Sequence, residues 1–263
     1  FSVLYVGIVY PIVGSWKWGG GFLDEWGFYD FAGSTLVHSV GGWAAVLYIA
    51  KLGPRIGKFG EDGKPRPIPG HNLPFAAAGV LILWLGWFGF NGGSVLSADP
   101  AITSLVITTT SIAAAAGGLA AATFVHFRYK NFDLTMFMNG ILGGLVSITA
   151  SADQVSIMDA MMIGSIGGIV VVLAVSLLDT LRLDDPVGAV AVHLFTGIWG
   201  TLAVGIFGAL ASWDQFLIQL AGIGLVALFC LATTATMLTV IEKIWGLRVS
   251  RGEELEGLDQ AEH

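Results

Sequence analysis

Two stretches of the sequence share one pattern, and this pattern determines the fold that we expect. The first reads DFAGSTLVH at positions 30–38, and the second reads DPVGAVAVH at positions 185–193. In each stretch an Asp opens an apolar segment, a Gly follows three residues later and a His eight residues later. Another Gly stands four residues after each His, and every matched pair is 155 positions apart. Two histidines in apolar segments with the same preceding residues indicate a duplicated half-unit.

The composition is typical of a membrane protein. Hydrophobic residues make up 55% of the chain and charged residues 12%, and the mean hydropathy is +0.78. A soluble domain carries about a quarter charged residues, so here much of the surface must face lipid. The 37 glycines agree with this, because small residues allow transmembrane helices to approach closely. The single cysteine, Cys230, excludes a disulfide framework within the chain.

The hydropathy pattern predicts an all-α, polytopic helix bundle. Its apolar segments are 1–14, 29–50, 73–93, 101–125, 134–151, 156–178, 186–211 and 214–242. The run from Phe1 to Val13 is shorter than the ~20 residues that a span needs. We therefore expect an N-terminally truncated fragment that begins inside a transmembrane helix. We expect a membrane domain over 1–245.

The basic residues predict the orientation of the bundle. Eleven of the twelve Lys and Arg residues lie in alternate connections, and only Lys17 lies on the other side. The positive-inside rule places the basic connections and the C-terminus in the cytoplasm, and the loop 15–28 outside. The polar, acidic tail 246–263 is not a further span. It is either a disordered end or a docking and regulatory segment.

With this orientation, the two copies of the repeat cross the membrane in opposite directions. The helix after Asp30 runs inward and the helix after Asp185 runs outward, which is an inverted-topology repeat of the kind found in many transporters. Eight residues at ~1.5 Å each place a histidine ~12 Å below its own face. Because the hydrocarbon core is ~30 Å thick, His38 and His193 approach its middle from opposite sides. We expect them to be neighbours.

The histidines allow three interpretations. They are unrelated buried residues, or metal ligands, or a pair that lines a narrow pore. Two ligands are too few for a structural metal site, and no other His, Cys or carboxylate is expected at that depth, so we predict no metal and no cofactor. Neutral imidazoles can hydrogen-bond a small polar permeant and relay a proton, which favours the pore.

Other residues have both a structural and a functional interpretation. Asp30 and Asp185 suit helix N-caps, and Asp30 also lies where a carboxylate would attract a cation at the outer mouth. Trp18 is either a membrane-belt anchor or a cation–π seat. Phe90 and Ser94 share a helix face, with the apolar ring deeper than the hydroxyl. Phosphate loops, nucleophile elbows and metalloprotease motifs are absent from the sequence, which disfavours an enzyme.

Taken together, these motifs resemble those of the ammonium transporter family (Amt/Mep/Rh), and more its Amt branch. The resemblance covers the whole chain and rests on DFAGS…H at 30–38, WGGG at 18–21, GWFGFNGGS at 86–94, DDP…H at 184–193 and GLRV…EGLD at 246–259.

The resemblance implies a fold of eleven helices, of which this chain has the last eight, and a homotrimer with one pore per subunit. It implies roles for the residues that match the family motifs. These are outer ammonium recruitment for Trp18 and Ser94 with Trp87 nearby, support of that site for Asp30, one of two gating rings for Phe90, and a pore pair for His38 and His193. For Asp185 and its neighbour Asp184 we expect a structural role at the helix start. The second gating ring would belong to an upstream helix.

The resemblance also implies partners. In bacterial members a PII-type nitrogen regulator binds the cytoplasmic mouth, which would give the tail a regulatory role. No nucleic-acid partner is expected. The main alternative is an ammonium sensor that signals through cytoplasmic partners, for which a fused kinase or cyclase domain would be the discriminating feature.

Overall fold

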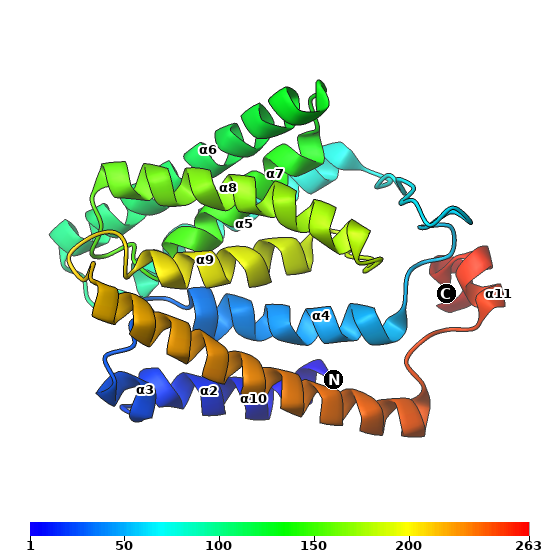
Figure 1. Cartoon of the computed structure of the whole chain (residues 1–263), viewed down its shortest axis with the longest axis horizontal. Helices are drawn as coiled ribbons and strands as arrows, with labels where there is room; N and C mark the ends of the chain where they lie inside the picture. Colours follow the sequence, from blue (N-terminus) through cyan, green and yellow to red (C-terminus); the bar gives the residue numbers. More distant parts are fainter. Residues whose placement is uncertain (263) are drawn as a thin grey trace.

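The computed structural model describes residues 1–262, and they form a bundle of roughly parallel and antiparallel helices (Figure 1). The elements in chain order are α1 (Ser2–Leu4), η1 (Tyr5–Val9), α2 (Tyr10–Lys17), α3 (Phe22–Glu25), η2 (Ser34–Ser39), α4 (Val40–Leu52), α5 (Leu73–Gly93), α6 (Pro100–Tyr129), α7 (Leu134–Ile148), α8 (Ile157–Thr180), η3 (Ala191–Phe195), α9 (Thr196–Ala203), α10 (Trp213–Trp245), α11 (Arg251–Glu256) and α12 (Leu258–Glu262). The three η elements are π-helical. Among these residues the one β-bridge joins Phe59 to Pro65.

Five helical segments in the described part of the chain are long and apolar enough to cross a membrane: Ser34–Leu52, Leu73–Gly93, Pro100–Tyr129, Ile157–Thr180 and Trp213–Trp245. Two shorter apolar helices, Leu134–Ile148 and Ala191–Ala203, complete the bundle. This confirms the expected helical membrane fold. The segment 73–93 was predicted with its observed bounds.

Polar residues at the helix starts explain where several helices begin. The Asp99 carboxylate accepts hydrogen bonds from the N–H groups of Ala101 and Ile102, and Asp133 caps α7 in the same way. Ser156 forms a reciprocal capping box with Asp159 at the start of α8. Such caps pair N–H groups that have no partner within the helix.

The predicted segments at 29–50 and 186–211 differ most from the observed helices. Helical structure begins only at Ser34 in the first and at Ala189 in the second, and α9 already ends at Ala203. Gly33 and Gly188 have φ of +111° and +77°, and such backbone interrupts a right-handed helix. Hydropathy does not detect these turns, because their residues are apolar.

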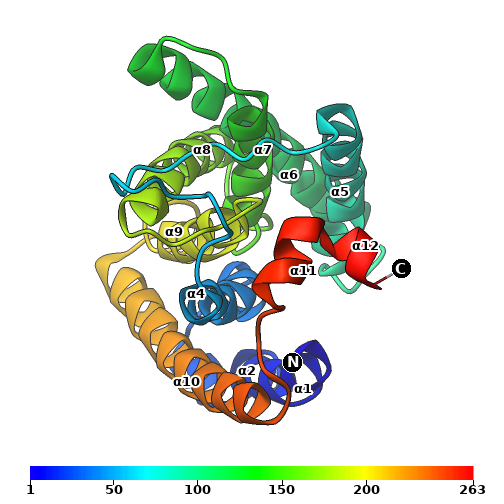
Figure 2. The same ribbon diagram turned by 90° about the vertical axis from the view of Figure 1, so that its right-hand side faces the viewer.

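Seen end-on in Figure 2, the bundle has α4 and α9 in the middle and a layer of helices on each side of them. α2 and α10 lie on one side of α4 and α9, and α5, α6, α7 and α8 lie on the other. Glycines bring α6, α7 and α8 close together: a Cβ on Gly144 would lie 2.1 Å from the Ala113 carbonyl oxygen, and one on Gly168 would lie 2.1 Å from that of Gly117. Close backbone approach at small residues is the usual packing of transmembrane helices.

The tail returns to the bundle. Arg248 donates to the carbonyl oxygens of Leu52 and Pro54 and pairs with Glu254, which accepts a hydrogen bond from the N–H of Ile56. α11 therefore lies beside the loop that follows α4 (Figures 1 and 2). Of the two interpretations of the tail, the structure agrees with docking.

Candidate functional site: two crossing half-helices and their histidines

A sharp turn precedes the first histidine. Asp30 is buried, and its Oδ1 accepts hydrogen bonds from the N–H groups of Gly33 and Ser34 at 2.9 and 2.8 Å. Its Oδ2 accepts from Thr35 and Leu36, both at 2.9 Å. One carboxylate thus pairs four N–H groups at the start of the helical segment, whose N-cap position is Gly33.

The second half repeats the part of this turn that involves Oδ2 of the aspartate. Gly188 has positive φ like Gly33, and Oδ2 of Asp185 accepts from the N–H groups of Val190 and Ala191 at 2.9 and 3.0 Å. These two donors lie 155 positions after Thr35 and Leu36, the donors to Oδ2 of Asp30. Both turns lead into π-helical backbone that carries the histidine. The duplication seen in the sequence is therefore also a duplication of conformation.

The two half-units run in opposite directions and cross closely. In Figure 1, α4 runs from left to right and α9 from right to left. A Cβ on Gly42 would lie 2.7 Å from the backbone of Leu194, and one on Gly197 would lie 2.4 Å from the carbonyl oxygen of Ser34. The glycine that follows each histidine by four residues thus allows the other half to approach. The expected inverted repeat is present.

The histidines meet at this crossing. The Nδ1 atoms of His38 and His193 are 3.2 Å apart, and the rings are stacked with centroids 5.2 Å apart and planes 16° apart. At this distance one Nδ1 donates and the other accepts, so at least one ring is neutral. The Nε2 atom of His38 is buried and has no hydrogen-bond partner within the described residues. This ring nitrogen is therefore free to hydrogen-bond a small polar molecule.

Helix α5 supplies an aromatic wall next to the pair. The Trp87 ring is stacked on His38 at 5.1 Å, and its Nε1 donates to the Thr149 hydroxyl at 3.0 Å. The Phe90 ring lies 5.6 Å from His38 and 5.7 Å from Trp87, and 39% of Phe90 is exposed. Trp87 is thus in contact with His38 itself.

The remaining predicted residues lie in two further places. The indole N–H of Trp18 donates to the Asp30 carbonyl oxygen at 3.0 Å, and Trp18 is 44% exposed. The Ser94 hydroxyl donates to the Phe90 carbonyl oxygen at 2.8 Å. Within residues 1–262, no hydrogen bond or ring contact joins Trp18 to Ser94 or to Trp87. The structure therefore links Trp18 to Asp30, and Ser94 to Phe90.

Asp184, although next to Asp185, has a different contact. It accepts hydrogen bonds from Nε and Nη2 of Arg55 at 2.8 and 3.0 Å and from the backbone N–H of Arg55 at 2.9 Å. Burial raises the pKa of the Asp184 carboxyl, but the hydrogen bonds from Arg55 outweigh burial and hold its pKa below the usual range. Asp184 joins the loops that follow α4 and α8.

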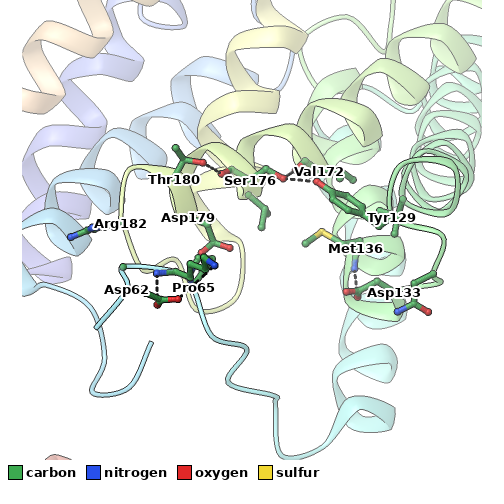
Figure 3. A pocket seen from close by; sticks show the side chains of 15 residues that line it. Asp62, Pro65, Tyr129, Asp133, Met136, Val172, Ser176, Asp179, Thr180 and Arg182 are labelled. Carbon is green, nitrogen blue, oxygen red and sulfur yellow. Dashed lines mark hydrogen bonds and ion pairs between the residues drawn. The ribbon is translucent and has the colours of Figure 1, made fainter. Parts of the chain in front are cut away.

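A pocket of about 640 Å³ is shown in Figure 3, and neither His38 nor His193 lines it. It lies between the loop at 62–65 and the ends of α6 and α8, with Asp179 and Arg182 in its wall. None of the predicted site residues lines it. Over the described residues, no group of three or more His, Cys, Asp or Glu side chains is arranged to hold a metal ion.

Sequence reasoning missed one polar residue near the outer turn. Gln219 of α10 is fully buried and hydrogen-bonds both the N–H and the carbonyl oxygen of Tyr29, next to Asp30. An amide within the apolar run FLIQLAGIG was the available signal, because a buried polar side chain needs partners.

The fold and the crossing define the class: a polytopic helical membrane protein with an inverted repeat and a histidine pair between its halves. The model of the Ammonium Transporter Family matches residues 1–263, and the chain belongs to that family.

Named relatives agree with this assignment. A putative ammonium transporter of Synechocystis is 47% identical over all of this chain and 60% of its own length. Ammonium transporter Amt2 of Archaeoglobus fulgidus is 40% identical over all of this chain and 62% of its own length. The chain thus spans about three fifths of the length of these relatives.

Solved structures share the fold. One named Sensor Amt Protein has a TM-score of 0.94 and 40% identity over 98% of this chain and 67% of its own. The crystal structure of Candida albicans Mep2 has a TM-score of 0.87 and 30% identity over 95% of this chain and 59% of its own.

Proposed function

We propose that the protein carries ammonium or ammonia across the membrane along a path that passes His38 and His193. The observation that carries the proposal is the contact of the two Nδ1 atoms at the crossing of two inverted half-units. Crossing half-helices at the middle of the bundle are where transporters with inverted repeats hold their substrates. The choice of ammonium or ammonia as the permeant rests on the family to which the chain belongs.

Cation recruitment is assigned to the outer side. Trp18 presents an exposed ring that can attract a small cation, and Asp30 holds the indole through its carbonyl oxygen. Ser94 offers a hydroxyl oxygen that can accept a hydrogen bond from ammonium. Trp87 is assigned to the path further in, where its ring is stacked on His38.

Deprotonation follows at the constriction. A bare cation in an apolar pore costs several kcal/mol, so ammonium gives up its proton before ammonia passes the Phe90 ring, which we assign to the gate. Ammonia then passes the imidazoles, whose nitrogens can hydrogen-bond a small polar molecule. The proton either returns to the outside or crosses by a separate relay.

The assembly and orientation follow the family. We propose a homotrimer in the cell membrane, with a membrane domain over 1–245 and the tail 246–263 in the cytoplasm. The basic loops support this orientation. A PII-type regulator at the cytoplasmic face would contact the end of the bundle where α11 lies beside the loop after α4.

A second candidate is an ammonium sensor. One observation favours it: the tail docks on a loop that also contacts Asp184, next to the second half-unit. A ligand-dependent movement of the two half-units would thereby be transmitted through Asp184 and this loop to the tail. Signalling partners that bind only when ammonium is present would distinguish a sensor from a transporter.

Transport by the full-length protein in liposomes tests the main proposal. Methylammonium uptake is recorded with internal pH and membrane current, and protein-free liposomes are the control. The proposal predicts saturable uptake, and the current distinguishes proton return from a separate proton relay. Liposomes that take up no more methylammonium than the protein-free control contradict it.

A further inference from the structure

One face of α10 holds the loop that precedes Asp30. Gln215, Gln219 and Gly222 are spaced four and three residues apart, so they share this face. The Gln215 side-chain N–H donates to the Gly27 carbonyl oxygen at 3.0 Å. The Phe28 ring is fully buried against Gly222, where an added Cβ would lie 2.3 Å from the ring. We call these three residues of α10 the loop clamp.

Gln219 is the central residue of the loop clamp, and its amide is fully used. Its Oε1 accepts from the Tyr29 N–H at 2.8 Å and from the Gln215 amide at 2.9 Å. Its Nε2 donates to the carbonyl oxygens of Tyr29 at 2.6 Å and Thr201 at 3.0 Å. A side-chain amide has two donors and two acceptor positions, so no capacity is left over. A leucine of similar size would replace none of these bonds.

The bonds of Gln219 reach the outer site through the backbone. They hold the peptide groups on both sides of Tyr29, and the second of these groups leads directly into Asp30. The Asp30 carbonyl oxygen is the partner of the Trp18 indole. On its other side the same loop is held by the residues just after α7, where the N–H groups of Phe31 and Ala32 donate to the carbonyl oxygens of Ala150 and Thr149. The backbone at Tyr29 to Ala32, which carries the outer-site residue Asp30, is therefore hydrogen-bonded to α10 on one side and to the residues after α7 on the other.

We propose that Gln219 is a positioning residue that sets the affinity of the outer site for the permeant cation. It touches no permeant; it acts by holding Trp18 and Asp30 in register through the Tyr29 backbone. This inference rests on the proposed transport function. A purely structural role would lower the amount of folded protein, whereas a positioning role changes the substrate concentration at half-maximal rate.

The test compares Gln219→Leu with the parent protein and with Thr234→Val in liposomes. Thr234 is a matched control, because it is a fully buried polar residue of α10 whose hydroxyl has no partner within the described residues. For Gln219→Leu we expect the apparent KM for methylammonium to rise about threefold to tenfold while Vmax per folded protein changes by less than about twofold. For Thr234→Val we expect both to stay at the parent values.

The outcomes separate this inference from the proposed function. A folded Gln219→Leu protein with the parent KM overturns the loop clamp, whatever its Vmax. Should that variant not fold, Gln215→Met removes only the two bonds that the Gln215 amide donates to Gly27 and to Gln219. We expect the KM of Gln215→Met to rise about twofold, and an unchanged KM overturns the inference. Absence of methylammonium uptake by the parent protein contradicts the proposed function and, with it, the role of Gln219.

Discussion

Replacing Gly197 with alanine would place a methyl group where the two half-units touch. The added Cβ would lie 2.4 Å from both the carbonyl oxygen of Ser34 and the hydroxyl of Ser39, whereas ordinary contact begins at 3.4 Å. The backbones must therefore separate by about 1 Å. Moved by the same amount, the Nδ1 atoms of His38 and His193 go from 3.2 Å to about 4 Å, beyond hydrogen-bond range.

The expected energetic effect has a definite sign. Overpacking a buried contact costs about 1–3 kcal/mol, which exceeds the gain of about 0.5–1 kcal/mol from replacing a helical glycine with alanine. Gly41→Ala is the matched control, because Gly41 is also helical and a Cβ there meets nothing within 4 Å. We expect Gly197→Ala to lower the unfolding temperature and Gly41→Ala to leave it unchanged or raise it.

Thermal unfolding in detergent and methylammonium uptake in liposomes provide the two measurements. We expect Gly197→Ala to unfold at a temperature lower by several degrees and to transport more slowly per folded protein. If Gly197→Ala and Gly41→Ala behave alike in both assays, the half-units do not touch as described, and the crossing cannot be what holds the histidines together.

Three further predictions concern the turns and the tail. Asp30→Asn should lower the unfolding temperature more than Asp185→Asn, because the first carboxylate accepts four backbone hydrogen bonds and the second accepts two; equal losses would contradict this. The hydrogen bonds from Arg55 hold the pKa of Asp184 below its usual ~3.9, so its stabilisation is present above that pH and is lost as pH falls through the lower, folded value. Asp184→Asn should therefore cost about 1–2 kcal/mol near pH 7, and the difference from the parent should shrink as pH falls through the lowered pKa of Asp184, measured as unfolding temperature against pH. Arg248→Gln should release the tail and accelerate its limited proteolysis; an unchanged rate would contradict the observed docking.

The fold and the histidine pair were predictable because their signals are local. Long apolar runs identify the helices, and the 155-residue offset of Asp30 and His38 from Asp185 and His193 shows a duplication without an alignment. The alternation of basic loops then indicates that the two copies cross the membrane in opposite directions. Each of these steps uses only the types of the residues and their spacing along the chain, which can be read directly from the sequence.

Other contacts were not predictable, because their partners are backbone atoms far away in the chain. Gln219 contacts the backbone of a residue 190 positions away, and Arg248 contacts the backbone of Leu52 and Pro54. Backbone groups are the same at every position, so no residue type marks them as partners. Trp87 was expected near the outer site, and its stacking on His38 depends on how far α5 is rotated and shifted against η2. Periodicity alone does not determine such an offset.

The most direct test of the histidine crossing is transport by His38→Ala in the full-length protein. Methylammonium uptake, internal pH and potassium current are recorded in liposomes, with parent protein and empty liposomes in parallel. We predict that removal of this imidazole lowers methylammonium transport, weakens exclusion of potassium, or does both. Parent-level methylammonium uptake with potassium still excluded would show that the permeant does not depend on the paired histidines, and would contradict the account.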